Sequence, residues 1–143
     1  MVYHFSMQRS PFTILSSHAD AVVIDLFEKA DHIASDPQIA TALHTTHIVS
    51  LKQVHGNTSV IVRDPSERTI AADGMWTDAR NLTLTIRIAD CQAFVAYDPV
   101  RKIIGLLHAG WKGIVHGAVP NFIKTYRNEW QGNPSNLVVA IAP

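Results

Sequence analysis

The chain of 143 residues is poor in charge, carries no net charge and contains a single cysteine. Charged residues make up 17% of the sequence, against about 25% in typical domains, and twelve basic side chains balance twelve acidic ones. The chain therefore has no excess of positive charge with which to attract nucleic acid or an anionic membrane surface, so neither is expected as a partner. The lone Cys91 excludes an intrachain disulfide and is typical of a reducing compartment, which predicts a cytoplasmic protein.

The sequence also has no long apolar run, and its first residues do not have the basic-then-apolar pattern of a signal peptide, so we expect neither a membrane span nor a signal peptide. The longest apolar stretches, such as residues 103–107, fall far short of the roughly 18 residues that a membrane span needs. Hydrophobic residues still make up 47% of the chain, which is enough for a core at this length without disulfides or a structural metal. We therefore expect one domain over residues 1–143.

Hydrophobic periodicity predicts an α+β fold in which helices pack on a mixed β-sheet. Apolar or β-branched runs typical of strands occupy residues 2–6, 21–27, 48–51, 58–62, 82–88, 94–97, 103–107 and 137–141. Residues 98–102 connect two of these runs as a hairpin. Because the last run stops at the end of the chain, we expect a protein that is shortened at its C-terminus.

Two helices are predicted between and after these strands. One covers residues 37–43, because Ser35 can cap its first turn and Pro37 suits that position. The other begins after Gly113, where apolar residues recur every three to four positions, and ends before Gly132. Pro120 lies inside this pattern and is expected to kink or offset the helix.

Two histidines and the cysteine each follow a strand-like run, where a sheet presents side chains at its rim. Imidazole and thiol groups are suitable ligands for a tetrahedral zinc ion that keeps its fourth position open. His55, Cys91 and His108 are separated by 91 − 55 = 36 and 108 − 91 = 17 positions. Only the fold could bring them together, so the spacing alone is a weak signal.

Simpler interpretations exist for the same segments. The chain contains eight histidines, and a single histidine is more often a surface or core residue than a ligand. Cys91 by itself is most simply an inert buried thiol. Trp111 is expected to pack in the core, and Asp73 and Gly74 to form a turn.

Four ordered motifs favour the functional interpretation. They read Q-V-H-G at residues 53–56, A-D-G-M-W-T at 72–77, A-D-C at 89–91 and H-A-G-W-K-G at 108–113. In this order and with similar gaps, they resemble the multicopper polyphenol oxidase or laccase-domain family, now regarded as zinc-dependent purine nucleoside phosphorylases. The resemblance covers about residues 48–143. It implies a laccase-domain fold of the cysteine-hydrolase kind, shared with cytotoxic necrotizing factor and other cysteine-dependent deamidases.

The resemblance also implies a cofactor and substrates. By it, His55, Cys91 and His108 look like the ligands of a zinc ion, and Cys91 and His108 look like catalytic residues. The implied substrates are phosphate and a purine nucleoside, namely adenosine, inosine, guanosine or methylthioadenosine. Adenosine deamination is a further implied activity. A monomer and a homo-oligomer are both compatible with the sequence.

Charged residues near the motifs are candidates for substrate binding. A phosphate nucleophile needs cationic donors, for which Arg87 and Lys112 are suitable. The start of the helix after Gly110 could add free N–H groups to such a site. Asp73 and Asp90 could orient a ribose hydroxyl or a histidine ligand, although turn and strand-end capping are equally good interpretations.

Other functions use the same residues differently. In a thiol-dependent hydrolase or deamidase, Cys91 would be the nucleophile and His108 its base, because an adjacent imidazole lowers the pKa of a thiol. A chain that has lost its catalytic competence would be a binding module. Copper polyphenol oxidation is the least favoured function, since it needs many more histidine ligands than these motifs supply.

Overall fold

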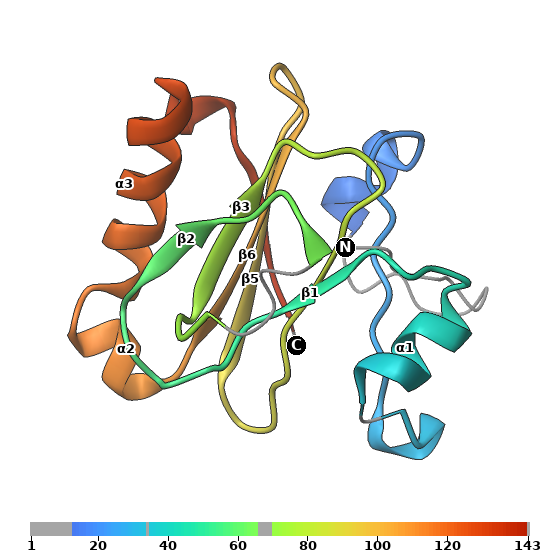
Figure 1. The fold of residues 1–143 in the computed structure, drawn as a ribbon. Helices are drawn as coiled ribbons and strands as arrows, with labels where there is room; N and C mark the ends of the chain where they lie inside the picture. Colours follow the sequence, from blue (N-terminus) through green and yellow to red (C-terminus); the bar gives the residue numbers. More distant parts are fainter. Residues whose placement is uncertain (1–12, 34, 66–69, 143) are drawn as a thin grey trace.

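The computed structural model describes residues 13–33, 35–65 and 70–142, which form an α+β fold around a mixed sheet (Figure 1). Its strands are β1 (Ile48–Ser50), β2 (Ser59–Ile61), β3 (Gly74–Thr77), β4 (Thr83–Thr85), β5 (Gln92–Asp98), β6 (Ile103–Ala109) and β7 (Val138–Ile141). Its α-helices are α1 (Asp36–Ala42), α2 (Trp111–Val115) and α3 (Ala118–Trp130), and short 3-10 helices cover Thr13–His18, Lys29–Asp31 and Pro134–Asn136. The predicted fold class is therefore confirmed. Within the described residues, every helix is too short or too polar to cross a bilayer.

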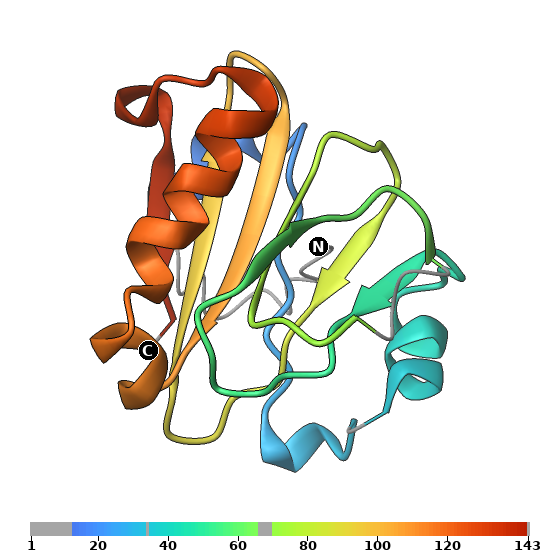
Figure 2. The same ribbon diagram turned by 60° about the vertical axis from the view of Figure 1, so that its left-hand side comes forward.

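Five strands form the main sheet in the order β2-β3-β6-β5-β7. The β2–β3 pair is parallel, whereas β3–β6, β5–β6 and β5–β7 are antiparallel. Strands β1 and β4 form a separate parallel pair, which lies apart from the main sheet in Figure 2. Periodicity does not predict this division into two sheets, because it indicates that a segment is a strand but not which strand it pairs with.

The main sheet has a different layer on each of its faces. Helix α3 covers one face, and the β1–β4 pair, residues 13–33 and helix α1 lie on the other (Figures 1 and 2). Neighbouring strand residues point to opposite faces, so Trp76 and Leu107 pack with α3 while Met75 and Leu106 pack in the opposite core. Both cores are fully buried, which fixes the register of β3 against β6.

Several local predictions are confirmed. Ser35 caps α1 through a capping box with Gln38, and Pro37 lies in the first turn. The β5–β6 connection is a hairpin, in which the Lys102 N–H donates to the Asp98 carbonyl at 2.8 Å. Strand β4, by contrast, covers only three residues of the predicted run at 82–88.

The helix predicted after Gly113 is in fact two helices. The chain turns at Gly117, whose φ of 80° lies in the left-handed region, and this turn separates α2 from α3. Pro120 therefore falls in the first turn of α3, where the backbone N–H groups have no partner within the helix, and it produces no kink. The strand predicted at residues 21–27 is absent, and the one at 2–6 lies outside the described residues.

Candidate metal centre

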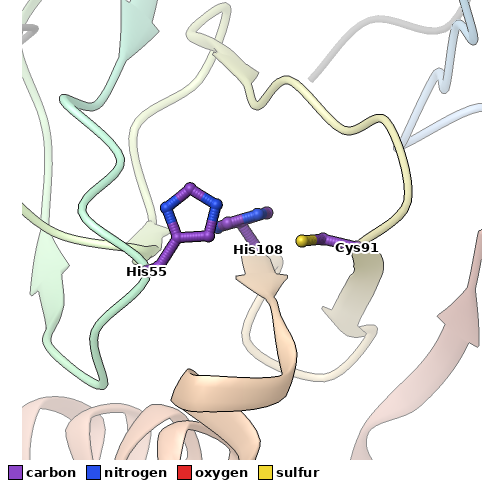
Figure 3. A group of neighbouring side chains, drawn as sticks. All are labelled: His55, Cys91 and His108. Atoms are coloured by element: carbon purple, nitrogen blue, oxygen red, sulfur yellow. The ribbon is translucent and has the colours of Figure 1, made fainter.

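His55, Cys91 and His108 converge at one end of the main sheet, as Figure 3 shows. Their potential ligand atoms, one from each side chain, all lie within 4.8 Å of one another. The two imidazole rings are nearly perpendicular, with centroids 4.9 Å apart. His108 is buried, Cys91 is partly buried and His55 is exposed, so the cluster is closed on the sheet side and open to solvent on the other.

The sheet explains how residues so distant in sequence meet. His108 lies in β6 opposite Ala93 of β5, and Cys91 immediately precedes β5. His108 lies two residues after Leu106 on β6, so the two side chains are on the same face of the sheet, away from α3. His55 lies in the connection between β1 and β2, with a left-handed φ of 58° that is uncommon for a residue other than glycine.

A fully buried carboxylate, Asp73, lies behind the cluster. Its Oδ1 atom is 2.9 Å from Nδ1 of His108, and the backbone N–H groups of Val54, His55 and Gly56 donate to its two oxygens. Burial raises the pKa of this carboxyl, but the hydrogen bonds from His108 and the backbone outweigh burial and leave the pKa below its usual value. Asp73 is therefore ionised at neutral pH.

The expected turn at Asp73 and Gly74 is wrong, because Gly74 begins strand β3. A turn pair is a local pattern, whereas hydrogen bonds from two distant segments determine the conformation here. The A-D-G motif points to Asp73 as a residue that could orient a histidine ligand. The three backbone N–H groups of residues 54–56 that donate to it were not predicted, because a backbone N–H group leaves no mark in the sequence.

The Cys91 thiol has a raised pKa. Its partial burial is the largest cause, and the carboxylates of Asp90 and Asp73 add to it. Asp90 contributes through a contact of 3.8 Å between its Oδ1 atom and the Cys91 Sγ atom. In the metal-free protein the thiol is therefore protonated at neutral pH, which is the less reactive form.

The two candidate phosphate-binding residues lie on different elements. Arg87 follows β4, and its guanidinium forms an ion pair with Asp36 of α1 at 2.6 Å. The Gln53 side chain fixes the backbone of Arg87 through two hydrogen bonds. Lys112 is exposed on α2, with its Nζ atom 5.7 Å from the centre of the Trp111 ring. Trp111 is 72% exposed, so the prediction that it packs in the core was wrong.

A cavity of about 680 Å³ lies between residues 25–33 and helix α1 on one side and residues 84–89 and the main sheet on the other. Its walls are largely apolar, with Phe27, Ile39 and Leu106 among them, and Arg87 also lines it. None of the three clustered side chains belongs to this lining. The segment 86–89 lines the cavity and leads directly to Asp90 and Cys91, so the cavity and the cluster share one loop.

Gly113 sets the distance between α2 and the loop that carries His55. A Cβ atom at this position would lie 2.7 Å from the backbone oxygen of Gly56, which cannot move aside as a flexible side chain can. We expect Gly113→Ala to lower the free energy of unfolding by about 1–3 kcal/mol and to weaken metal binding, measured by denaturation and metal titration. Gly56→Ala is the matched control, because a Cβ there meets ordinary contacts of 3.5 Å and 3.6 Å. Equal losses in the two variants would contradict this packing argument.

Comparisons with known proteins point to one family. Residues 21–143 match the family model described as multi-copper polyphenol oxidoreductase laccase. A relative from Rickettsia conorii, named purine nucleoside phosphorylase RC0672, is 30% identical over 128 residues, which are 90% of this chain and 52% of the relative. Another from Bacillus subtilis, named purine nucleoside phosphorylase YlmD, is 37% identical over 73 residues, or 51% of this chain and 26% of the relative.

Solved structures show the same fold. YlmD from Geobacillus stearothermophilus superimposes with a TM-score of 0.70 at 26% identity, over 81% of this chain and 47% of that one. The hypothetical protein YfiH from Bacillus licheniformis gives a TM-score of 0.67 at 31% identity, over 73% of this chain and 43% of that one. The chain thus spans about half the length of these structures.

Proposed function

The chain belongs to the multi-copper polyphenol oxidoreductase laccase family, and from this membership we propose that it acts as a zinc-dependent purine nucleoside phosphorylase. The observation that carries the proposal is the approach of His55, Cys91 and His108 to within 4.8 Å of one another. The relatives named as purine nucleoside phosphorylases support it. The lone cysteine supports the cytoplasm as the proposed compartment.

The donor set fits a catalytic zinc ion. Two imidazoles and one thiolate are three protein ligands, which is the usual number where a fourth position stays open for water or substrate. The exposed side of the cluster, at His55, leaves room for that position. When bound, zinc would act as a Lewis acid on a group of the purine or on a water molecule.

The proposed reaction exchanges one bond at the anomeric carbon of the nucleoside. A phosphate oxygen forms a bond to this carbon while the bond to the purine nitrogen breaks, and the electron pair leaves with the base, which then takes up a proton. Arg87 and Lys112 are proposed to bind the phosphate, because a guanidinium and an ammonium both donate charge-assisted hydrogen bonds. His108 and Cys91 are proposed to hold the metal ion and to act at the catalytic centre.

Incubation with each nucleoside, with and without phosphate, tests this proposal. We expect phosphate-dependent release of free base from adenosine, inosine, guanosine or methylthioadenosine, together with a sugar 1-phosphate. Adenosine deamination, the proposed second activity, would instead give inosine and ammonia without phosphate. A zinc-loaded chain that releases no base with any of the four nucleosides would contradict the proposed phosphorolysis.

The proposed role of Arg87 can be separated from its structural ion pair. We expect Arg87→Ala to raise KM for phosphate at least about tenfold, because a charge-assisted hydrogen bond contributes about 1.5–3 kcal/mol. The exposed ion pair with Asp36 should contribute less than about 1 kcal/mol to stability. Arg63→Ala is the matched control, since Arg63 also pairs with carboxylates, those of Asp78 and Glu129. A KM for phosphate that stays unchanged in Arg87→Ala would refute the assignment.

Copper polyphenol oxidation is the less supported function, although the family description names it. Among the described residues, one group of three histidine, cysteine or carboxylate ligands meets, and multicopper chemistry needs several. A thiol hydrolase is less supported as well, because the raised pKa of Cys91 disfavours a free thiolate.

A further inference from the structure

We infer that Asp73 is the positioning residue of the metal centre and holds two of its three ligand residues through one buried carboxylate. His55 and His108 lie on segments 53 positions apart, since 108 − 55 = 53, and both contact this group. The inference rests on the metal site proposed above. It adds a residue that touches neither metal nor substrate and acts through the ligands.

The contact between Asp73 and His108 determines which nitrogen of the His108 ring carries the proton. The Asp73 carboxylate carries no proton and can only accept, so the ring nitrogen that faces its Oδ1 atom at 2.9 Å is the hydrogen-bond donor. A neutral imidazole that carries its proton on Nδ1 has an unprotonated Nε2 atom, which is the form that binds a metal ion. A carboxylate behind a histidine ligand commonly fixes the ring in this way.

The second contact holds the His55 loop. Successive N–H groups at Val54, His55 and Gly56 converge on Asp73 at 3.4, 2.9 and 2.7 Å. Such a concave arrangement of backbone donors forms where a left-handed residue lies in the turn, and His55 has a φ of 58°. The carboxylate therefore compensates for an uncommon backbone conformation at the ligand itself.

The sheet fixes Asp73 relative to both ligands. Gly74 pairs with Leu107 in the β3–β6 ladder, which places Asp73 opposite His108. The His108 backbone N–H also donates to the Asp73 carbonyl at 2.8 Å. Because Asp73 is fully buried, water cannot replace its hydrogen bonds when the carboxylate is removed.

Nitrogen-15 NMR of the histidine rings tests the inference on the metal-free protein, with the His108 signal assigned by its absence in His108→Ala. We expect the wild type to carry the proton on Nδ1 of His108, and Asp73→Asn to populate the other tautomer. Zinc affinity of Asp73→Asn should fall roughly 10- to 100-fold in a competition titration, the effect of losing a partner behind a metal ligand.

Asp98→Asn is the matched control. Asp98 is equally buried and accepts hydrogen bonds from Tyr126 and two backbone N–H groups, but it lies at the far end of β5 from Cys91. We expect this variant to lose stability while the His108 tautomer and the zinc affinity stay unchanged.

Three results would overturn the inference: a wild-type His108 protonated on Nε2, a folded Asp73→Asn with unchanged tautomer and zinc affinity, or the same losses in Asp98→Asn. If Asp73→Asn does not fold, the inference is still tested by the tautomer of His108 in the wild type. Failure of the proposed function has a different signature, because a wild type that binds no zinc would still show the tautomer that Asp73 imposes.

Discussion

Replacement of His55 by alanine is expected to remove the metal ion from the protein and with it any phosphorolysis. The wild type, expressed without added metal, should carry close to one zinc ion per chain, and His55→Ala close to none. His55 is one of three donors that meet within 4.8 Å. Loss of a direct ligand should weaken binding by more than about 100-fold, since the loss of an outer partner alone costs roughly 10- to 100-fold. Elemental analysis after dialysis against a metal buffer measures this change.

His116→Ala is the control for the His55 variant. It removes an exposed imidazole from the end of α2, outside the group of His55, Cys91 and His108, and should retain the zinc ion. The same comparison separates the metal site from a thiol hydrolase. If Cys91 were a nucleophile with His108 as its base, activity would survive His55→Ala and be lost in Cys91→Ser alone.

Trp76→Ala is expected to have the largest effect on stability, lowering the free energy of unfolding by about 3–5 kcal/mol. Trp76 is completely buried between β3 and α3, stacked on Phe122 with ring centroids 4.2 Å apart. Its indole N–H donates to the Phe122 carbonyl at 2.9 Å. The ring also lies over Gly105, where a Cβ atom would come within 2.3 Å of it. Because the indole fills the space between Gly105 and Phe122, the truncation is expected to leave a cavity.

Urea or guanidinium denaturation measures the effect of the Trp76 change. Trp111→Ala is the matched control, because the same residue type at that position is 72% exposed and should change stability by less than about 0.5 kcal/mol. The structure indicates that the packing of α3 on the sheet is a main source of stability. Similar losses of stability in both tryptophan variants would contradict this.

The elements that could be predicted from sequence are those with a local cause. The cap at Ser35, the hairpin at Asp98 and most strands follow from propensity and periodicity, and the structure contains them. The pairing of β1 with β4 could not be predicted, because a strand pattern carries no partner information. Of the two effects expected of Pro120, the kink does not occur, because α3 begins at Ala118 after Gly117 and the proline falls in its first turn.

For the candidate site too, some features could be predicted from the sequence and others could not. The motifs singled out His55, Cys91 and His108, and the structure brings these side chains together, although their separations in sequence gave no such indication. The exposure of Trp111 could not be predicted, because the pattern does not show which face of α2 meets solvent. The convergence of three backbone N–H groups on Asp73 could not be predicted either, because it arises only when β3 and the His55 loop are packed together.

X-ray absorption at the zinc edge of the wild-type protein tests the central claim most directly. If His55, Cys91 and His108 hold one zinc ion, the spectrum should contain one sulfur at about 2.3 Å and two nitrogens at about 2.0–2.1 Å, with a light atom in the remaining position. Absence of the sulfur contribution, or absorption at the copper edge in its place, would contradict a zinc centre built from these three side chains.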